Sequence, residues 1–155
     1  MAVRMLRFLV SMSLLLLTSP NTDVIDVTFF QNVLIQDSSM QTGDDCIAIS
    51  GGSSLVNVTG IACGPGHGIS LGKRNDTVEG VHVRNCSLTK TKYGARIKTF
   101  PVGIGCAKQI TFEEITLVET RYPIFIDKNY GSYPSTDEEV EVSGVTFRGF
   151  SRNIL

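Results

Sequence analysis

The chain has 155 residues, 42% of them hydrophobic, and a formal net charge of −1. This length fits one domain or a piece of a larger one, and the apolar content is sufficient for a core. A near-neutral chain has no extended basic surface, so the composition argues against nucleic acid as a partner. Any attraction for a charged ligand must therefore come from a local group of side chains.

The N-terminal segment has the features of a targeting sequence. Arg4 and Arg7 precede or interrupt an apolar run over residues 8–17. The run has the length of a signal-peptide core and is short for a membrane span. We therefore divide the chain into a signal peptide or apolar leader at 1–18 and a folded domain at 19–155. The alternative is a segment of the core, because no small-x-small cleavage motif follows the run.

Four cysteines and three glycosylation sequons indicate an exported protein. The cysteines contain no C-x-x-C pair, which disfavours zinc, and an even number in an exported protein favours disulfides. Cys46 and Cys63 could close a short loop, and a Cys86–Cys106 pair is arithmetically allowed. Free buried thiols are the alternative for both pairs. The N-x-[ST] sequons, which matter only in an exported chain, begin at Asn57, Asn75 and Asn85.

Short β-branched triplets recur along the chain in two series. The first series lies at 33–35, 56–58, 81–83, 110–112 and 145–147, and the second at 47–49, 69–71, 96–98 and 124–126. Triplets separated by clusters of Gly, Asn, Asp and Ser are typical of strands and turns, and no convincing amphipathic helix intervenes. Two strands in each repeat predict an all-β fold, a right-handed parallel β-helix with one coil per repeat. A β-sandwich is the alternative, but it does not explain the repeated interval.

Three ionisable residues share one interval. Asp23, Asp45 and His67 are 22 residues apart, and an isoleucine follows two positions after each. Equivalent positions of stacked coils lie about 4.8 Å apart, so we expect these side chains in register on one face. Asp44 precedes Asp45, and neighbouring strand residues normally point to opposite faces. Both can reach one cleft only if the backbone bulges or turns near Gly43.

Such a cluster of acids has a specific chemical use. Three carboxylates this close cannot all ionise freely, so one should have a raised pKa, which leaves an acid beside a base. That pairing serves glycoside hydrolysis, with inversion when a water molecule lies between the base and the sugar. Two other interpretations remain open at this level. The motifs are also ordinary turn sequences, and their oxygen atoms would suit calcium.

Further side chains extend this candidate site. Arg96 and Lys98 flank Ile97, so both project from one strand face and would attract an anionic substrate. The alternative is a solvated basic strand face. Tyr130 could stack on a sugar ring or be an exposed loop tyrosine. His82 is most simply an outward-facing strand residue.

Four ordered motifs carry a family resemblance. They are Asn21-Thr22-Asp23, Gly43-Asp44-Asp45, Gly66-His67-Gly68 and Arg96-Ile97-Lys98. Their order and approximate spacing resemble those of the polygalacturonases, which are pectin-degrading glycoside hydrolases, and the flanking residues resemble the plant branch. The resemblance runs from about residue 19 to the C-terminus. Relative to the family, the N-terminal coils and cap and the last coils are absent, so we expect a partial β-helix.

The resemblance implies a role for each acid. The activity would be hydrolysis of α-1,4-linked galacturonan with inversion. Asp44 would be the proton donor, while Asp23 and Asp45 would hold and activate the water. His67 would support the acid or the substrate.

The resemblance also implies binding residues and a cross-link. Arg96 and Lys98 would bind a galacturonate carboxylate, and Tyr130 would contact the substrate. Cys46 and Cys63 would form a disulfide, and no metal or other cofactor would be needed.

These inferences lead to one hypothesis and two alternatives. The hypothesis is a secreted, monomeric hydrolase that acts on polygalacturonan, or pectin, outside the cell and so contributes to cell wall organisation. It would have no nucleic-acid partner and, once mature, no membrane association. The first alternative is an inactive or non-catalytic module that binds acidic polysaccharide. The second keeps the chemistry but changes the substrate to rhamnogalacturonan or xylogalacturonan.

Overall fold

The structure is a computed structural model that describes residues 5–9, 13–14, 19–72, 77–101, 105–131 and 140–153. Every regular element in these ranges is a β-strand. Within them there is no helix with the length and apolar character needed to cross a membrane. The predicted leader at 1–18 falls largely outside the described residues, so its assignment stays a prediction.

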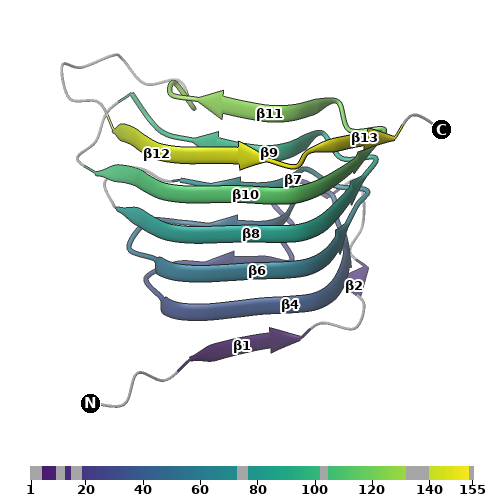
Figure 1. Ribbon diagram of the computed structural model, residues 1–155, viewed down its shortest axis with the longest axis horizontal. Coiled ribbons are helices and arrows are strands. Elements are labelled where there is room, and N and C mark those ends of the chain that lie inside the picture. The colour runs from purple at the N-terminus through teal and green to yellow at the C-terminus, as the bar shows by residue number, and fades with distance from the viewer. Residues whose placement is uncertain are drawn as a thin grey trace.

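The strands form two parallel sheets that the chain visits alternately (Figure 1). The larger sheet has the order β1-β4-β6-β8-β10-β12, with β2 beside β4 and β13 beside β10. Its strands are β1 (Leu6–Leu9), β2 (Ser13–Leu14), β4 (Gln31–Gln41), β6 (Ser54–Cys63), β8 (Val78–Thr89), β10 (Cys106–Val118), β12 (Glu141–Arg148) and β13 (Ser151–Asn153). The smaller sheet has the order β11-β9-β7-β5-β3. Its strands are β3 (Ile25–Val27), β5 (Asp45–Ile49), β7 (Gly68–Leu71), β9 (Tyr93–Lys98) and β11 (Tyr122–Asp127). One strand from each sheet makes a coil, which confirms the predicted parallel β-helix.

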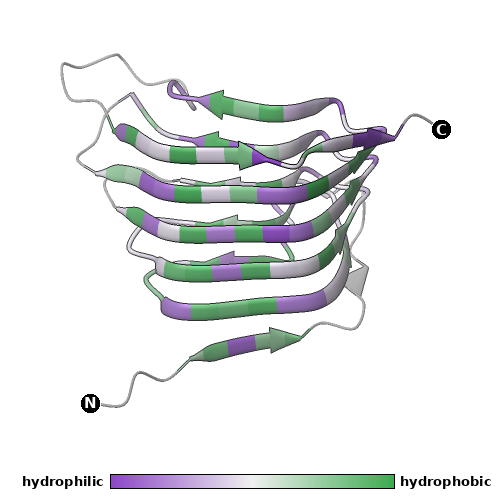
Figure 2. Ribbon diagram, viewed as in Figure 1, coloured by the Kyte–Doolittle hydropathy of each residue, from purple (hydrophilic) through white to green (hydrophobic). Residues whose placement is uncertain are grey.

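The core consists of apolar columns that run through successive coils. In the smaller sheet, Ile25 pairs with Ile47 and Ile47 with Ile69, so the interval of 22 residues is one coil, as predicted. In the larger sheet, Val33 pairs with Val56 and Val56 with Val81. All these side chains are at most 8% exposed. Figure 2 shows polar and apolar residues alternating along the long strands, so one face lines the core and the other is polar.

The long strands contain two ladders of residues in the left-handed backbone region. The ladders have φ between 47° and 65° and comprise Asn32, Leu55, Gly80, Gln109 and Gly144 in one, and Asp37, Gly60, Asn85, Glu114 and Gly149 in the other. Because each coil has its left-handed residues at equivalent positions, adjacent strands change direction together and remain paired. A Cβ atom on Gly60 would lie 2.7 Å from Oδ1 of Asp37, so a larger residue there would displace the Asp37 side chain.

The cysteines take two different states. Cys46 and Cys63 form a disulfide. Cys86 is a buried free thiol and Cys106 a partly buried one, so the second pairing that the even count allowed does not form.

Candidate active site

The site begins at a bulge in β5. Asp45 pairs with Gly68 on β7, whereas Ile47 pairs with Ile69. Two steps along β5 therefore match one step along β7, and Cys46 is the extra residue. The chain also bends at Gly43 and Asp44, just before β5, so the local irregularity expected near Gly43 is present and the bulge at Cys46 adds to it. Because Cys46 is inserted, the residues before it shift by one position relative to β7.

The carboxylate of Asp45 is completely buried and has charged partners. Its side chain is 0% exposed. Ser70 donates a hydrogen bond of 2.6 Å to Oδ1, and the Lys98 ammonium donates one of 2.9 Å to Oδ2. Nη1 of Arg96 lies 4.0 Å from Oδ1. A carboxylate without water is tolerated when opposite charge and hydrogen-bond donors replace its hydration, and these three side chains replace it here.

Asp44 has different surroundings although it is the adjacent residue. Its Oδ1 lies 2.8 Å from Nδ1 of His67, and the backbone N–H of Asn21 donates to its Oδ2 at 3.0 Å. The Asp44 and His67 side chains are 19% and 31% exposed, so this pair is open to solvent. The His67 backbone N–H also donates to the carbonyl of Asp44 at 2.6 Å. The acid and the imidazole are thus fixed to each other through both side chain and backbone.

Asp23 completes the group of acids. Its Oδ1 accepts a hydrogen bond of 3.1 Å from the backbone N–H of Asp45. Burial raises the pKa of Asp23, and the negative charges of Asp45 and Asp44 raise it further, while the Asp45 N–H and the Lys98 charge act in the opposite direction. The sequence predicted that one carboxyl of the three would have a raised pKa, and this carboxyl is that of Asp23.

The structure gathers all four predicted ionisable side chains in one place. One carboxylate oxygen each from Asp44 and Asp45 and one ring nitrogen of His67 lie within 4.8 Å of one another. The register differs from the sequence expectation in one respect, because the bulge pairs Asp45 with Gly68 and not with His67. The three ligand atoms would also be close enough for a cation, although the Lys98 ammonium already contacts Asp45.

The cations and aromatic rings form a layer beside the acids. The guanidinium carbon of Arg96 lies 4.3 Å from the ring centroid of Tyr93 and 5.0 Å from that of Tyr130. Arg96 is 5% exposed, which is inconsistent with a solvated basic strand face. Its Nε has no hydrogen-bond partner among the described residues. Tyr130 is half-buried, and Nζ of Lys98 lies 5.4 Å from its ring, so it is not a free loop tyrosine.

Two residues of this site were missed by sequence reasoning. Ser70 is the middle residue of an apolar triplet and pairs with Arg96 of the next coil, so a polar residue facing outward beside the cations was the available signal. Tyr93 opens β9 and contacts both Arg96 and His67, with 6.2 Å between the centroids of the His67 and Tyr93 rings. Nothing in the local sequence distinguishes Tyr93 from a core aromatic.

Comparisons with known proteins assign the chain to a family. Residues 12–153 match the family described as Glycosyl hydrolases family 28. The chain belongs to this family. Among its relatives, a probable polygalacturonase of Arabidopsis thaliana is 49% identical over 144 residues, and a polygalacturonase of Malus domestica is 45% identical over 132 residues. These matches cover 86% and 82% of this chain but only 32% and 29% of the relatives. This family 28 chain therefore spans about a third of the length of the curated relatives.

A solved structure supports the fold assignment. The chain resembles an endo-xylogalacturonan hydrolase from Aspergillus tubingensis with a TM-score of 0.74, covering 87% of this chain and 48% of the other. The sequences are 23% identical, so the likeness concerns the β-helix alone.

Proposed function

We propose that this family 28 site hydrolyses α-1,4-galacturonosidic bonds of polygalacturonan by acid–base catalysis with inversion. The observation that carries the proposal is the cluster of Asp44, Asp45 and His67, with Asp23 bonded to the Asp45 backbone beside it. Membership of family 28 and the polygalacturonases among the plant relatives support the reaction class and the substrate.

Asp44 is the proposed acid. It is the most exposed of the two adjacent carboxyls, so it is the one that a glycosidic oxygen can approach. The His67 ring holds Asp44 at Oδ1. In this proposal Asp44 donates a proton to the leaving oxygen, and His67 acts as the positioning residue.

Asp23 and Asp45 form the proposed water-activating side, and the water would reach it at Asp23, which is partly exposed, because the Asp45 carboxylate is completely buried. The Lys98 ammonium stabilises the negative charge of Asp45, which suits a base. Asp23 lies against the Asp45 backbone, and its raised pKa lets it accept or share a proton from the attacking water. One oxygen of Asp44 approaches one of Asp45 within 4.8 Å, which is closer than the separation usual for inverting pairs. The configuration of the product is therefore a direct test of the stereochemical part.

The cationic layer is the proposed site for a galacturonate carboxylate. Arg96 has an Nε without a partner in the described part of the chain. Lys98 has two further N–H donors besides the one that Asp45 accepts. The Tyr130 ring lies beside both cations and offers a surface for a sugar ring. Rhamnogalacturonan and xylogalacturonan also contain galacturonate, so they are the alternative substrates.

The setting of the reaction is also part of the proposal. We infer a secreted, monomeric protein that acts on pectin outside the cell, with no membrane or nucleic-acid partner in its mature form. The sequons, the disulfide and the plant relatives support an extracellular site of action in the cell wall.

The experiment measures reducing ends released from polygalacturonate by the chain and by Asp44→Asn. Loss of a general acid should lower the rate about 10²–10⁴-fold. Asp37→Asn is the matched control, because it makes the same change at an exposed residue on the larger sheet and should release reducing ends at the original rate. Equal release by Asp44→Asn and the unmodified chain would remove Asp44 as the acid. NMR of the first-formed product should show the β-anomer, and the α-anomer would contradict inversion.

A measurement of polygalacturonate binding, made beside the reducing-end assay, tests the non-catalytic alternative. Binding of polygalacturonate without turnover, weakened by Arg96→Gln, would identify a binding module in place of a hydrolase. A hydrolase should bind and release reducing ends, and Arg96→Gln should raise KM.

A further inference from the structure

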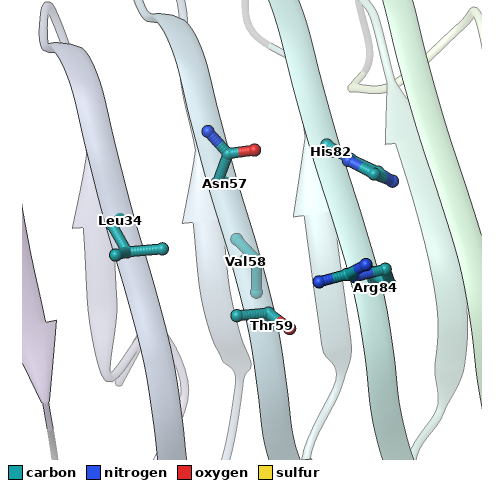
Figure 3. Close-up of a pocket in the computed structure, with 6 residues that line it drawn as sticks. All are labelled: Leu34, Asn57, Val58, Thr59, His82 and Arg84. Carbon is teal, nitrogen blue, oxygen red and sulfur yellow. The ribbon is translucent and has the colours of Figure 1, made fainter.

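A shallow trough lies on the outer face of the larger sheet, away from the strands that carry the acids (Figure 3). It has a volume of about 290 Å³ and is lined by Leu34, Asn57, Val58, Thr59, His82 and Arg84. The short side chains of Asn57 and Thr59 on β6 form its floor. Leu34 on β4 and the longer side chains on β8 form its sides. This volume is at the lower limit of ligand-binding pockets.

The floor of the trough contains a glycosylation sequon. Asn57-Val58-Thr59 follows the strand alternation, so Val58 is buried at 1% exposure while Asn57 and Thr59 face outward. Asn57 is exposed, and its side-chain amide has no hydrogen-bond partner in the part of the chain that the structure describes. The sequon is therefore accessible, and its asparagine has no structural role that a modification would disrupt.

We propose that Asn57 carries an N-linked glycan whose first sugars lie in this trough. The amide nitrogen of Asn57 would form a bond to C1 of an oligosaccharide supplied as a lipid-diphosphate conjugate. The C1–O bond to the diphosphate breaks, the lipid diphosphate leaves, and the amide loses one proton. The inference rests on the secretory route that the proposed function includes, but not on hydrolysis.

The trough has the surface that a sugar needs. Leu34 offers an apolar side to one sugar face. Arg84 is exposed and forms no ion pair with any described residue, so its guanidinium is available to sugar oxygens. His82 differs, because its Nε2 lies 2.7 Å from Oε1 of Glu113 and its ring extends toward β10 in Figure 3. Arg84 is thus the polar contact that we assign to the glycan.

The position of the trough also explains how the glycan and the proposed catalysis would coexist. The acids and the cationic layer lie on β5, β7, β9 and the adjoining loops, whereas the trough spans β4, β6 and β8 of the other sheet. A glycan at Asn57 would cover the outer polar face and leave the acids open.

Attachment is tested by expressing the full chain behind a secretion signal in a eukaryotic host and measuring occupancy of the Asn57 peptide by mass spectrometry. We expect a glycan that is released by peptide-N-glycosidase, with Asp then found at position 57. Thr59→Ala should abolish occupancy and Thr59→Ser should retain it, while Asn85→Gln should leave it unchanged. An unmodified Asn57 peptide in the unmodified chain would overturn the proposal. Since attachment occurs during translocation, the membrane fraction gives the same readout if secretion fails.

The seat of the glycan is tested by the reactivity of Arg84 toward phenylglyoxal, measured by peptide mass. Arg84 should react several-fold more slowly in the glycosylated chain than in Asn57→Gln from the same host. Arg152, which is exposed on β13, is the internal control and should react equally in both. Equal rates at Arg84 would show that the glycan extends into solvent, which refutes the trough as its seat. Neither readout depends on hydrolase activity, so a failure here is distinct from a failure of the proposed function.

Discussion

Removing Lys98 from its ion pair with Asp45 should destabilise the protein far more than the same change in a surface pair of the same length. The Nζ–Oδ2 distance of the Lys98–Asp45 pair is 2.9 Å, and the two side chains are 18% and 0% exposed. Lys108 and Glu79 form a pair at the same distance of 2.9 Å, but these side chains are 42% and 40% exposed. Lys98→Met and Lys108→Met therefore make one chemical change in two environments.

The magnitude follows from what Lys98→Met leaves behind. Asp45 keeps the Ser70 hydrogen bond and the Arg96 guanidinium at 4.0 Å, but it loses its only ammonium partner in the described chain. Breaking a buried ion pair by removing one partner costs about 3–5 kcal/mol. We expect about 3 kcal/mol, the lower end of that range, because Arg96 remains and water can reach the partly exposed position of Nζ. Lys108→Met should have almost no effect, since solvent already screens that pair.

Urea denaturation measures both variants. With an m value of about 2 kcal/mol/M, a loss of about 3 kcal/mol lowers the midpoint by about 1.5 M. Adding Asp45→Asn to Lys98→Met should recover part of the loss, because the uncompensated charge is then removed. Equal midpoints for Lys98→Met and Lys108→Met would refute the reasoning from burial. No recovery in the double variant would show that the loss comes from packing and not from charge.

Three further predictions concern the acids and the cysteines. The pKa of Asp23 is raised above 3.8, so its carboxyl binds protons on folding and its contribution to stability falls as the pH rises through the folded pKa. Asp23→Asn should therefore raise the melting temperature at neutral pH and leave it unchanged well below pH 3.8; an equal shift at both pH values would contradict this. Replacing Cys46 and Cys63 by alanine should lower the unfolding free energy by about 3 kcal/mol, measured in urea, because their disulfide closes a short loop. Burial raises the pKa of Cys86 to about 11, so iodoacetamide at pH 8 should label Cys106 well before Cys86, and equal labelling in the native protein would count against the burial.

The coil repeat was predictable from the sequence because each coil repeats the same packing requirement. Ile25, Ile47 and Ile69 fill one column of the core, and a β-branched apolar residue at each position leaves a visible periodicity. The left-handed ladders were not predicted. In the second ladder, Asp37 and Gly60 are residue types that adopt the left-handed conformation readily. Glu114 is not such a type, yet it has the same conformation. Since other side chains occur there, no single residue type marks the ladder.

The exact register of the acids could not be read from the sequence. The equal spacing of Asp23, Asp45 and His67 suggested one straight column, but the bulge at Cys46 removes Asp45 from alignment with His67. The insertion accompanies two sets of contacts with residues distant in sequence. Cys46 bonds to Cys63 in the disulfide. Asp45 contacts Ser70 in the next coil and Lys98 in the coil after it. Neither is encoded in a local pattern.

The bulge and the bend before it have a chemical consequence, because together they give two adjacent aspartates different environments. In a regular strand, Asp44 and Asp45 would project to opposite faces, and only one could belong to the site. With Cys46 inserted, Asp45 is buried against Lys98 while Asp44 remains at the solvent side against His67. Acid–base catalysis requires two carboxyls that share a cleft but differ in surroundings. The inserted Cys46 turns Asp45 to the face of Ser70 and Lys98, and the bend at Gly43 and Asp44 directs the other carboxyl to His67.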